Sequence, residues 1–172
     1  MRYIHDYDSP IGRILLASDG EALVGLWFEG QKHFASTLTE AEQAARPALF
    51  DDAVRWLDGY FAGEKPDFTP RINLIGTPFQ RSVWARLLEI PYGQTVTYGR
   101  LAEALGGALP RAVGGAVARN PISIVVPCHR VVGANGALTG YAGGVDKKLK
   151  LLELEKAGIT ADSPKNRGGS LQ

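Results

Sequence analysis

The sequence is poor in cysteine and histidine, with one and three of these residues among 172. A single cysteine excludes an internal disulfide, as expected for a protein of the reducing cytoplasm. A structural zinc site needs four closely spaced ligands, which this chain lacks. No apolar run approaches the roughly 20 residues that span a bilayer, and the start Met1–Asp6 lacks the apolar core of a secretion signal. We therefore expect a cytoplasmic protein with no metal and no cofactor.

The composition is otherwise that of an ordinary globular protein, but the charges are unevenly distributed. Apolar residues make up 45% of the chain and charged residues 22%. Residues 1–70 hold six Lys and Arg against twelve Asp and Glu, a net charge of −6. Residues 71–172 hold thirteen against six, a net charge of +7. This split indicates two domains, of which the basic one would face a polyanion. A chance imbalance over a solvated surface is the competing interpretation.

The N-terminal part has the pattern of a strand meander followed by a helix. Turn signals at Ser9-Pro10 and Asp19-Gly20 separate the predicted strands, which cover residues 2–8, 11–18 and 21–28. A helix is predicted over 47–62, because Pro47 suits a first turn and apolar residues follow at helical spacing. A polar, proline-punctuated connection then places the domain boundary between about 65 and 78.

The C-terminal part is predicted to be mostly helical. The predicted helices cover residues 78–90, 98–106, 111–118 and 145–157, and residues 161–172 have the composition of a loose tail. Two of the short helices are joined by a glycine-containing turn, which resembles a helix-turn-helix. The second of them contains Gly114-Gly115, and each glycine costs a helix roughly 1 kcal/mol relative to alanine. Tight packing against a neighbouring helix is one explanation, and close approach to a DNA backbone is the other.

The only cysteine, Cys128, lies in a distinctive setting. The apolar run Ile124–Val126 predicts a buried strand, which Pro127 would end because proline cannot donate to a sheet. His129 and Arg130 follow at once, and a neighbouring base or cation makes a thiolate more available. The competing interpretation is a small buried apolar residue, which is the commoner fate of a lone cysteine.

The residues around Cys128 resemble the active-site signature of the O6-alkylguanine-DNA alkyltransferases, the methylated-DNA–protein-cysteine methyltransferases. Further motifs of this family recur in order over roughly residues 75–158, a combination more specific than any one motif, whereas the first 70 residues show only weak likeness. The motifs are Ile90-Pro91-Tyr92-Gly93, Thr97-Tyr98, Arg111–Ala116, Asn120-Pro121, Pro127–Val131, Gly140–Gly144 and Leu151–Glu155.

The resemblance implies an α+β fold with two domains. Residues 1–70 would form an antiparallel β-sheet with a helix, ribonuclease H-like and of uncertain role. Residues 71–160 would form a mostly helical winged helix-turn-helix domain with the DNA-binding and active sites, followed by a flexible tail, 161–172. The partner would be double-stranded DNA bound through the minor groove by a monomer, with cooperativity on DNA left open.

The resemblance also assigns roles in the chemistry. Cys128 would be the nucleophile of a Cys128–water–His129–Glu155 relay, in which Glu155 stabilises the imidazolium as an acid does in a catalytic triad. From spacing alone, Glu155 could equally be a solvated helix residue. Tyr98 would supply a proton to the leaving guanine, and Asn120 would brace the active-site turn.

The remaining assignments concern DNA and the guanine pocket. Arg111 would fill the gap left by a flipped-out nucleotide, and flipping costs least at a damaged pair. The DNA-contacting set comprises Arg111, Ala112, Gly114, Gly115 and Tyr98. The pocket set comprises Cys128, Val131, Tyr141, Ala142 and Gly143, while Pro127 and Arg130 serve structure beside the site. Position 142 is alanine where some relatives carry serine, which keeps the backbone donor but loses a hydroxyl.

The expected function is direct reversal of O6-alkylguanine, and also O4-alkylthymine, by one irreversible transfer to Cys128. The product thioether would consume the protein. Three other functions are possible, and one feature argues against each. A lesion-binding protein without transfer would lack the active cysteine, which is present here. A Cys-His hydrolase usually draws its two catalytic residues from distant sequence positions, and a transcription regulator of this family carries an additional zinc module.

Overall fold

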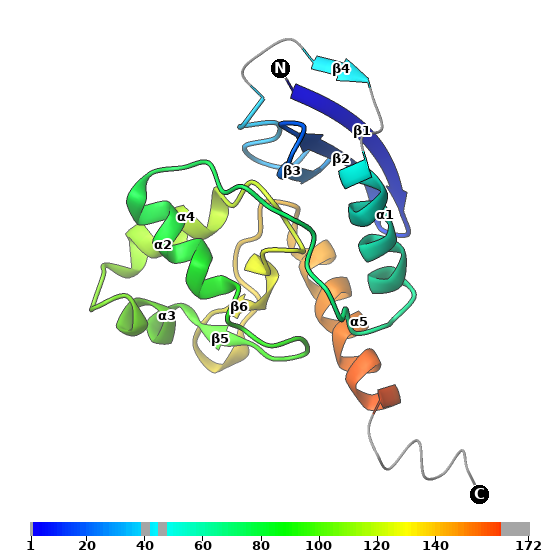
Figure 1. Cartoon of the computed structure of the whole chain (residues 1–172). Helices are drawn as coiled ribbons and strands as arrows, with labels where there is room; N and C mark the ends of the chain where they lie inside the picture. Colours follow the sequence, from blue (N-terminus) through cyan, green and yellow to red (C-terminus); the bar gives the residue numbers. More distant parts are fainter. Residues whose placement is uncertain (1, 39–41, 45–47, 163–172) are drawn as a thin grey trace, which may run out of the picture.

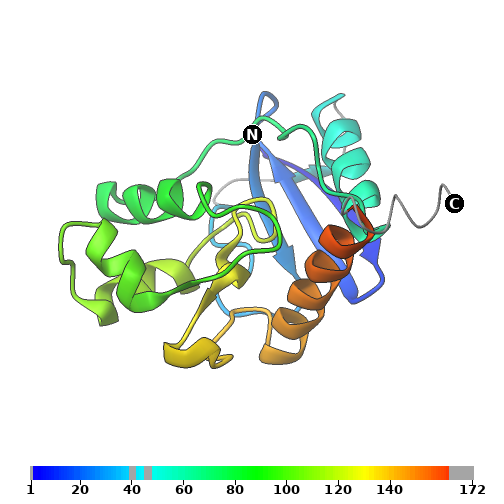
Figure 2. The ribbon, with the colours of Figure 1, turned by 90° about the horizontal axis from the view of Figure 1, so that it is seen from below.

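The computed structural model describes residues 2–38, 42–44 and 48–162. A sheet and helix α1 lie on one side, and helices α2, α3 and α4 lie on the other (Figure 1). The segment that carries Cys128 runs between α2–α4 and the last helix, α5, in both views (Figures 1 and 2). The predicted α+β fold is confirmed.

The N-terminal sheet has the strand order β3-β2-β1-β4. Strands β1 (Arg2–Ser9), β2 (Gly12–Ser18) and β3 (Leu23–Phe28) form an antiparallel meander, as predicted. A short strand that was not predicted, β4 (Glu42–Ala44), runs parallel to β1 at the sheet edge. Helix α1 (Ala48–Phe61) agrees with the predicted helix and packs on β1, β2 and β3.

Local sequence signals mark the starts of the three helices on the other side. Helix α2 (Pro78–Leu87) begins with a capping box, in which Gln80 N donates to Thr77 Oγ1 over 3.1 Å and Thr77 N donates to Gln80 Oε1 over 3.0 Å. Helix α3 (Tyr98–Ala104) is capped by the Thr97 hydroxyl. Helix α4 (Pro110–Ala118) has proline in its first turn. Strand β5 (Val96–Thr97) pairs in parallel with β6 (Val131–Val132) beside these helices.

Two of these helices end earlier than predicted. Helix α2 stops at Leu87 rather than residue 90, and α3 stops at Ala104 rather than residue 106. In α3 the cause is the pair Gly106 and Gly107, whose φ angles of 76° and 81° lie in the left-handed region that favours glycine.

The strand predicted at Ile124–Val126 is wrong. Only Ile122 makes a single bridge to Leu26 of β3, and the chain then turns. Ile124 has a φ of 70°, an unusual value for a β-branched residue. Val126 N donates back to Ile122 O over 3.0 Å, so the turn satisfies its own backbone. The run is apolar because it is buried, not because it is extended.

Helix α5 (Val145–Asp162) is longer than predicted. It continues through Gly158, so the first two residues of the predicted tail are helical, and residues 163–172 lie outside the described residues. A Cβ at Gly158 would lie 2.8 Å from Gly63 O and closer still to the Tyr92 hydroxyl. Gly158 therefore serves close packing of α5 and not helix termination.

The two halves of the chain share one hydrophobic core. It includes Ile14 and Leu26 from the sheet together with Val83, Ile122 and Val126 from the other half. The connecting segment runs beside β3, where Leu23 N donates to Arg71 O over 2.9 Å. None of the helices formed by the described residues is long and apolar enough to cross a membrane. The predicted domain division stays a prediction.

Candidate functional site

Cys128 begins a single turn of 3-10 helix, η1 (Cys128–Arg130), directly after Pro127. Its backbone N–H donates to Val126 O over 2.8 Å, and Arg130 N donates to Pro127 O over 3.0 Å. The side chain is only 4% exposed. The preceding turn and η1 together hold the thiol in one position.

The thiol lies at a cavity of about 310 Å³. Helices α3 and α4 form one wall, the loop before α5 forms another, and Lys32 reaches the rim from the N-terminal half. The lining residues are Lys32, Tyr98, Gly114, Val117, Ala118, Cys128, Gly140, Tyr141, Ala142, Gly144 and Val145. This is a size suited to a small planar group such as a nucleobase.

The environment of Cys128 favours the neutral thiol. Burial raises the pKa of Cys128 above its ordinary value, while a hydrogen bond from Asn120 and the positive charge of Lys148 act in the opposite direction. Because only the thiolate is strongly nucleophilic, the site needs a base that takes the proton when the reaction begins.

That base is available in His129, which is completely buried. Its Nε2 lies 2.5 Å from Glu155 Oε2, and its Nδ1 is buried without a hydrogen-bond partner. An ionised carboxylate only accepts hydrogen bonds, so Nε2 carries the proton and Nδ1 is the free acceptor. Burial lowers the pKa of His129, although Glu155 acts to raise it. The imidazole is therefore neutral at pH 7 and can accept a proton.

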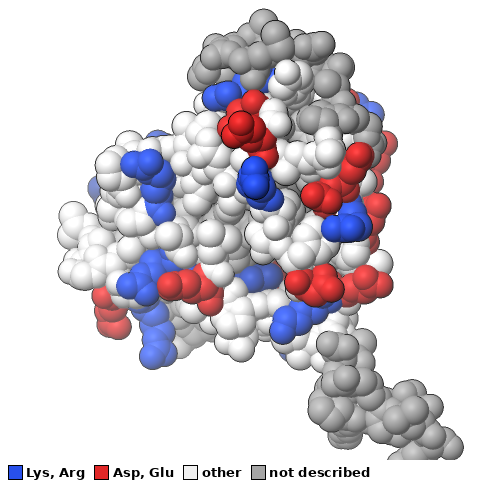
Figure 3. All heavy atoms as spheres, in the orientation of Figure 1, with Lys and Arg blue, Asp and Glu red and all other residues white. Residues whose placement is uncertain are grey.

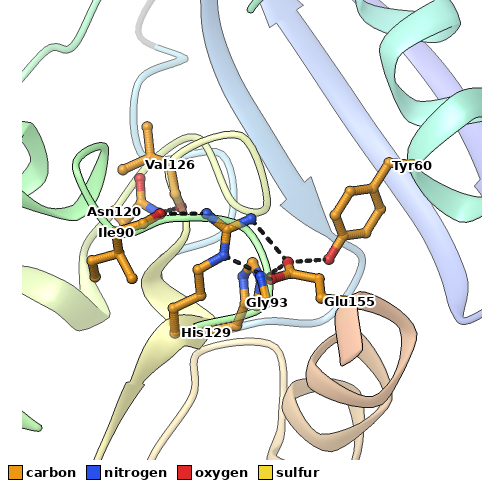
Figure 4. Close-up of polar contacts among 8 residues, drawn as sticks. Tyr60, Ile90, Gly93, Asn120, Val126, His129 and Glu155 are labelled. Carbon is orange, nitrogen blue, oxygen red and sulfur yellow. Dashed lines mark hydrogen bonds and ion pairs between the residues drawn. The ribbon is translucent and has the colours of Figure 1, made fainter. Parts of the chain in front are cut away.

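Glu155 is a completely buried carboxylate that accepts five hydrogen bonds (Figure 4). Its Oε1 accepts from Gly93 N over 3.0 Å and from Arg130 Nε over 2.8 Å. Its Oε2 accepts from His129 Nε2, from Arg130 Nη2 over 3.1 Å and from the Tyr60 hydroxyl over 2.7 Å. Burial alone would raise the pKa of Glu155, but His129 and Arg130 hold it well below its ordinary value.

Asn120 supports the turn that carries Cys128. Its Nδ2 donates to Val126 O over 2.8 Å, and its Oδ1 accepts from Ile122 N over 3.0 Å. Both ends of the apolar turn are thereby tied to one buried side chain. Arg130 has a comparable role on the other side, since its Nη1 donates to Ile90 O over 2.7 Å.

Two tyrosines face the thiol across the cavity. Burial and the proximity of Cys128 raise the pKa of Tyr98, which starts α3 and is half-buried. The Tyr141 hydroxyl is buried near Cys128 and Ser123 but forms no hydrogen bond of ordinary geometry. Both hydroxyls therefore remain protonated and are able to donate to a group bound in the cavity.

The predicted DNA-contacting residues lie along α4. Arg111 and Ala112 are exposed at its start, while Gly114 and Gly115 are partly exposed. A Cβ at Gly114 would have no neighbour closer than 4.0 Å, and one at Gly115 would lie 3.4 Å from the Arg119 guanidinium. Packing within the chain therefore does not require glycine at either position, and the explanation by a neighbouring helix fails.

Charged side chains are distributed unevenly over the surface, as they are along the sequence. On the face shown in Figure 3, most acidic side chains lie on the side that holds β1 and α1. The side that holds α2 and α3 carries several Lys and Arg side chains. These two helices contain the exposed residues Arg81, Arg86 and Arg100.

The remaining residues of the predicted pocket differ in whether they line the cavity. Ala142 lines the cavity, and its carbonyl accepts from Lys32 N over 3.2 Å. A Cβ at Gly143 would lie 2.9 Å from the Tyr141 ring and 3.1 Å from Phe28, so glycine is required there for packing. Val131 is buried in β6 and is not among the residues that line the cavity.

The sequence did not reveal Lys148, which is completely buried beside the site. Its Nζ donates to Thr139 O over 2.8 Å and to Gly140 O over 3.3 Å, and it lies 5.9 Å from the Tyr98 ring centroid. Burial lowers the pKa of Lys148, and Cys128 acts to raise it. Its spacing of seven residues from Glu155 was the available signal, because such residues share one helix face.

Within the part of the chain that the structure describes, no group of three or more His, Cys, Asp and Glu side chains is arranged to hold a metal ion.

Two family models match the chain. One is described as 6-O-methylguanine DNA methyltransferase, DNA binding domain, and matches residues 78–157. The other is described as 6-O-methylguanine DNA methyltransferase, ribonuclease-like domain, and matches residues 2–74. The likeness therefore extends through the N-terminal half.

Known proteins are similar over almost the whole chain. A methylated-DNA–protein-cysteine methyltransferase of Mycobacterium leprae is 48% identical over 91% of this chain and 93% of its own length. One of Methanosarcina acetivorans is 50% identical over 89% and 97%. The crystal structure of Mycobacterium tuberculosis OGT in complex with DNA has a TM-score of 0.82 at 45% identity, covering 91% of this chain and 94% of that one.

Proposed function

The chain belongs to the 6-O-methylguanine DNA methyltransferase family, and on that premise we propose that it removes the alkyl group from O6-alkylguanine in DNA by transfer to Cys128. Family membership makes the chain a DNA-binding methyltransferase of DNA repair. The observation that carries the finer proposal is the position of Cys128 at a nucleobase-sized cavity, with the buried His129–Glu155 pair beside it.

Activation of the thiol falls to His129. Its free Nδ1 accepts the thiol proton through a bridging water, and the adjacent carboxylate of Glu155 stabilises the imidazolium that forms. Because Glu155 is fixed by five donors, the imidazole is held in one tautomer and one orientation.

The transfer step exchanges one bond for another. Cys128 Sγ attacks the alkyl carbon, a new C–S bond forms, and the bond between that carbon and guanine O6 breaks with its electron pair left on guanine. Tyr98 donates a proton to the departing base and is reprotonated from the site, so the thiol proton ends on guanine. The product is unmodified guanine and a thioether on Cys128, and each protein molecule reacts once.

Access of the base to Cys128 requires that the nucleotide leave the duplex. Gly114, Val117 and Ala118 of α4 form a cavity wall, and the exposed start of the same helix carries Arg111. With α4 in the minor groove, the open backbone at Gly114 and Gly115 lies against the DNA and Arg111 occupies the vacated place in the stack. We expect the same cavity to accept O4-alkylthymine, because a pyrimidine is smaller than a purine.

Intact mass measurement after incubation with an O6-methylguanine oligonucleotide tests this proposal. A gain of one methyl group, about 14 Da, is expected on the peptide that holds Cys128. The control is Cys128→Ala, which should bind the lesion and gain no mass. Lesion binding by the wild-type protein without an adduct would favour a binding module, and a mass gain in Cys128→Ala would overturn the assignment of the nucleophile.

A further inference from the structure

The catalytic carboxylate makes a contact with the N-terminal half of the chain. Tyr60, in the last turn of α1, donates its hydroxyl to Glu155 Oε2 over 2.7 Å, across 95 residues of sequence (Figure 4). Both side chains are completely buried. The other donors to Glu155 that the structure describes come from Gly93, His129 and Arg130, all in the C-terminal half.

The Tyr60 ring is held on several sides. It stacks on Trp56 at 5.3 Å with an angle of 10° between the ring planes, and it meets Phe61 and Tyr92 edge-on at 5.3 and 6.3 Å. Aromatic contacts of this kind restrict a ring to one rotamer. The hydroxyl therefore has a fixed position, and the carboxylate oxygen it bonds is fixed with it.

The hydroxyl is also a permanent donor. Burial raises the pKa of Tyr60 well above its ordinary value, and the negative charge of Glu155 raises it further. Tyr60 consequently never competes for the proton that moves between Cys128 and His129, and it acts on that proton only through Glu155.

We propose that Tyr60 is a positioning residue of the His129–Glu155 pair and that the N-terminal half contributes to transfer through this hydroxyl. The inference rests on the transfer function proposed above. Oε2, which Tyr60 binds, is the same oxygen that binds His129 Nε2. A hydrogen-bond donor on Oε2 withdraws negative charge from this oxygen and fixes the orientation of the carboxylate. The Tyr60 hydroxyl therefore controls how strongly Glu155 stabilises the imidazolium of His129.

Several charged or titratable groups surround the pair and contribute to its protonation. They are Tyr60 from α1, Arg130 and Cys128 from η1, Lys148 from α5 and Tyr141 from the loop before α5. Among them only Tyr60 lies in the N-terminal half. Its removal leaves Arg130 and Gly93 on Glu155, so we expect a partial loss of rate and not its abolition.

The test is Tyr60→Phe, which removes the hydroxyl and keeps the ring. We expect the transfer rate at neutral pH to fall roughly tenfold, as is usual when an outer hydrogen bond to an active-site group is lost. With less charge withdrawn from Glu155, the pKa of His129 rises. Because the neutral imidazole is the base, the low-pH limb of the rate profile should move to higher pH. A purely structural role would not move this limb.

A matched control exists on the same helix, at the exposed residue Asp58 of α1. Tyr7 donates to Asp58 Oδ1 over the same 2.7 Å, but at an exposed position away from Glu155. Tyr7→Phe therefore removes an equivalent hydroxyl–carboxylate bond and should leave the rate and its pH profile unchanged. Equal effects of the two substitutions would overturn the proposal.

A second variant keeps the test decisive if Tyr60→Phe folds poorly. Replacement of Tyr60 by 3-fluorotyrosine retains the bond but makes the hydroxyl a stronger donor, so the low-pH limb should move to lower pH, opposite to the Phe variant. A limb that stays in place in this variant would refute the inference. The wild-type mass gain is measured in parallel: its absence would refute the transfer function itself, whereas its presence with unaffected variants would refute the role of Tyr60 alone.

Discussion

The two halves of the molecule place their polar groups in opposite ways. In the N-terminal half, ion pairs such as Arg13–Asp8 and Arg55–Asp52 lie at the surface and the buried residues are largely apolar. In the C-terminal half, His129, Arg130, Lys148 and Glu155 are all buried around one cysteine. A buried charge is tolerated only when it is paired and hydrogen-bonded. The buried charges of the C-terminal half therefore need rigidly held partners around them. The sheet and α1 contribute to this packing through the common hydrophobic core and the Tyr60 hydroxyl.

The largest expected effect comes from breaking the buried cluster. Glu155→Gln leaves Arg130 without its charge partner, which should lower the free energy of unfolding by about 3 kcal/mol, because an unpaired buried charge is costly. Transfer should fall by at least a hundredfold, since the imidazolium loses its counter-charge. Denaturant unfolding and single-turnover kinetics measure the two effects.

A surface pair provides the control for this substitution. Glu89 bonds Arg86 over 3.1 Å, and both side chains are about half exposed. Glu89→Gln should lower the free energy of unfolding by no more than about 1 kcal/mol.

The difference in stability between the Glu155 and Glu89 variants should also depend on pH. The folded-state pKa of Glu155 lies below its unfolded value, so its stabilisation is complete above that unfolded value, about 4.3, and is lost as the pH falls below it. Similar costs for the two variants would contradict the contrast between buried and exposed charge.

A moderate effect on repair is expected from substitution of Arg111. This residue is charged and exposed, and it lies on α4, the helix that forms one wall of the cavity. Arg111→Ala should slow repair in duplex DNA roughly tenfold, because the gap left by a flipped nucleotide costs a few kcal/mol when it is not filled. Reaction with the free alkylated base should be unchanged. Arg13→Ala, an equal loss of charge in the N-terminal sheet, should leave both rates unaffected. Parallel losses on duplex and free base would argue against a flipping role.

The smallest effect separates two kinds of glycine. Gly114→Ala would place its methyl group 4.0 Å from the Tyr98 ring, an ordinary contact, so it should stabilise α4 by up to about 1 kcal/mol. Because α4 is proposed to lie against the DNA backbone, the added methyl group should also weaken DNA binding several-fold. Gly158→Ala should lower the melting temperature, because its Cβ would lie 2.8 Å from Gly63 O. Melting curves and binding titrations distinguish them. Undiminished DNA affinity in Gly114→Ala would mean that α4 does not approach the duplex there.

Regular elements were predicted more successfully than the segments that carry chemistry. The meander, α1 and the starts of α2 and α3 follow from turn residues, apolar spacing and caps, which act over a few residues. The apolar run before Cys128 was wrongly predicted to be a strand, because a buried turn and a buried strand select the same residue types. On α5, the buried face carries the charged residues Lys148 and Glu155 beside Leu151, whereas the apolar Leu149 is exposed. Buried charges break the pattern on which such a prediction depends.

The amino-acid sequence by itself determined the family, and it is the source of the proposal that Cys128 is the nucleophile, because the motifs from Ile90 to Glu155 are contiguous segments with specific composition. It also identified Asn120 and Glu155, which the structure brings to the turn and to His129. Only the tertiary structure decided that Lys148 is buried beside the thiol and that Tyr60 reaches Glu155. The reason is physical: a contact across 95 residues depends on how helices α1 and α5 pack, and no local pattern in either helix records the partner that the other one presents.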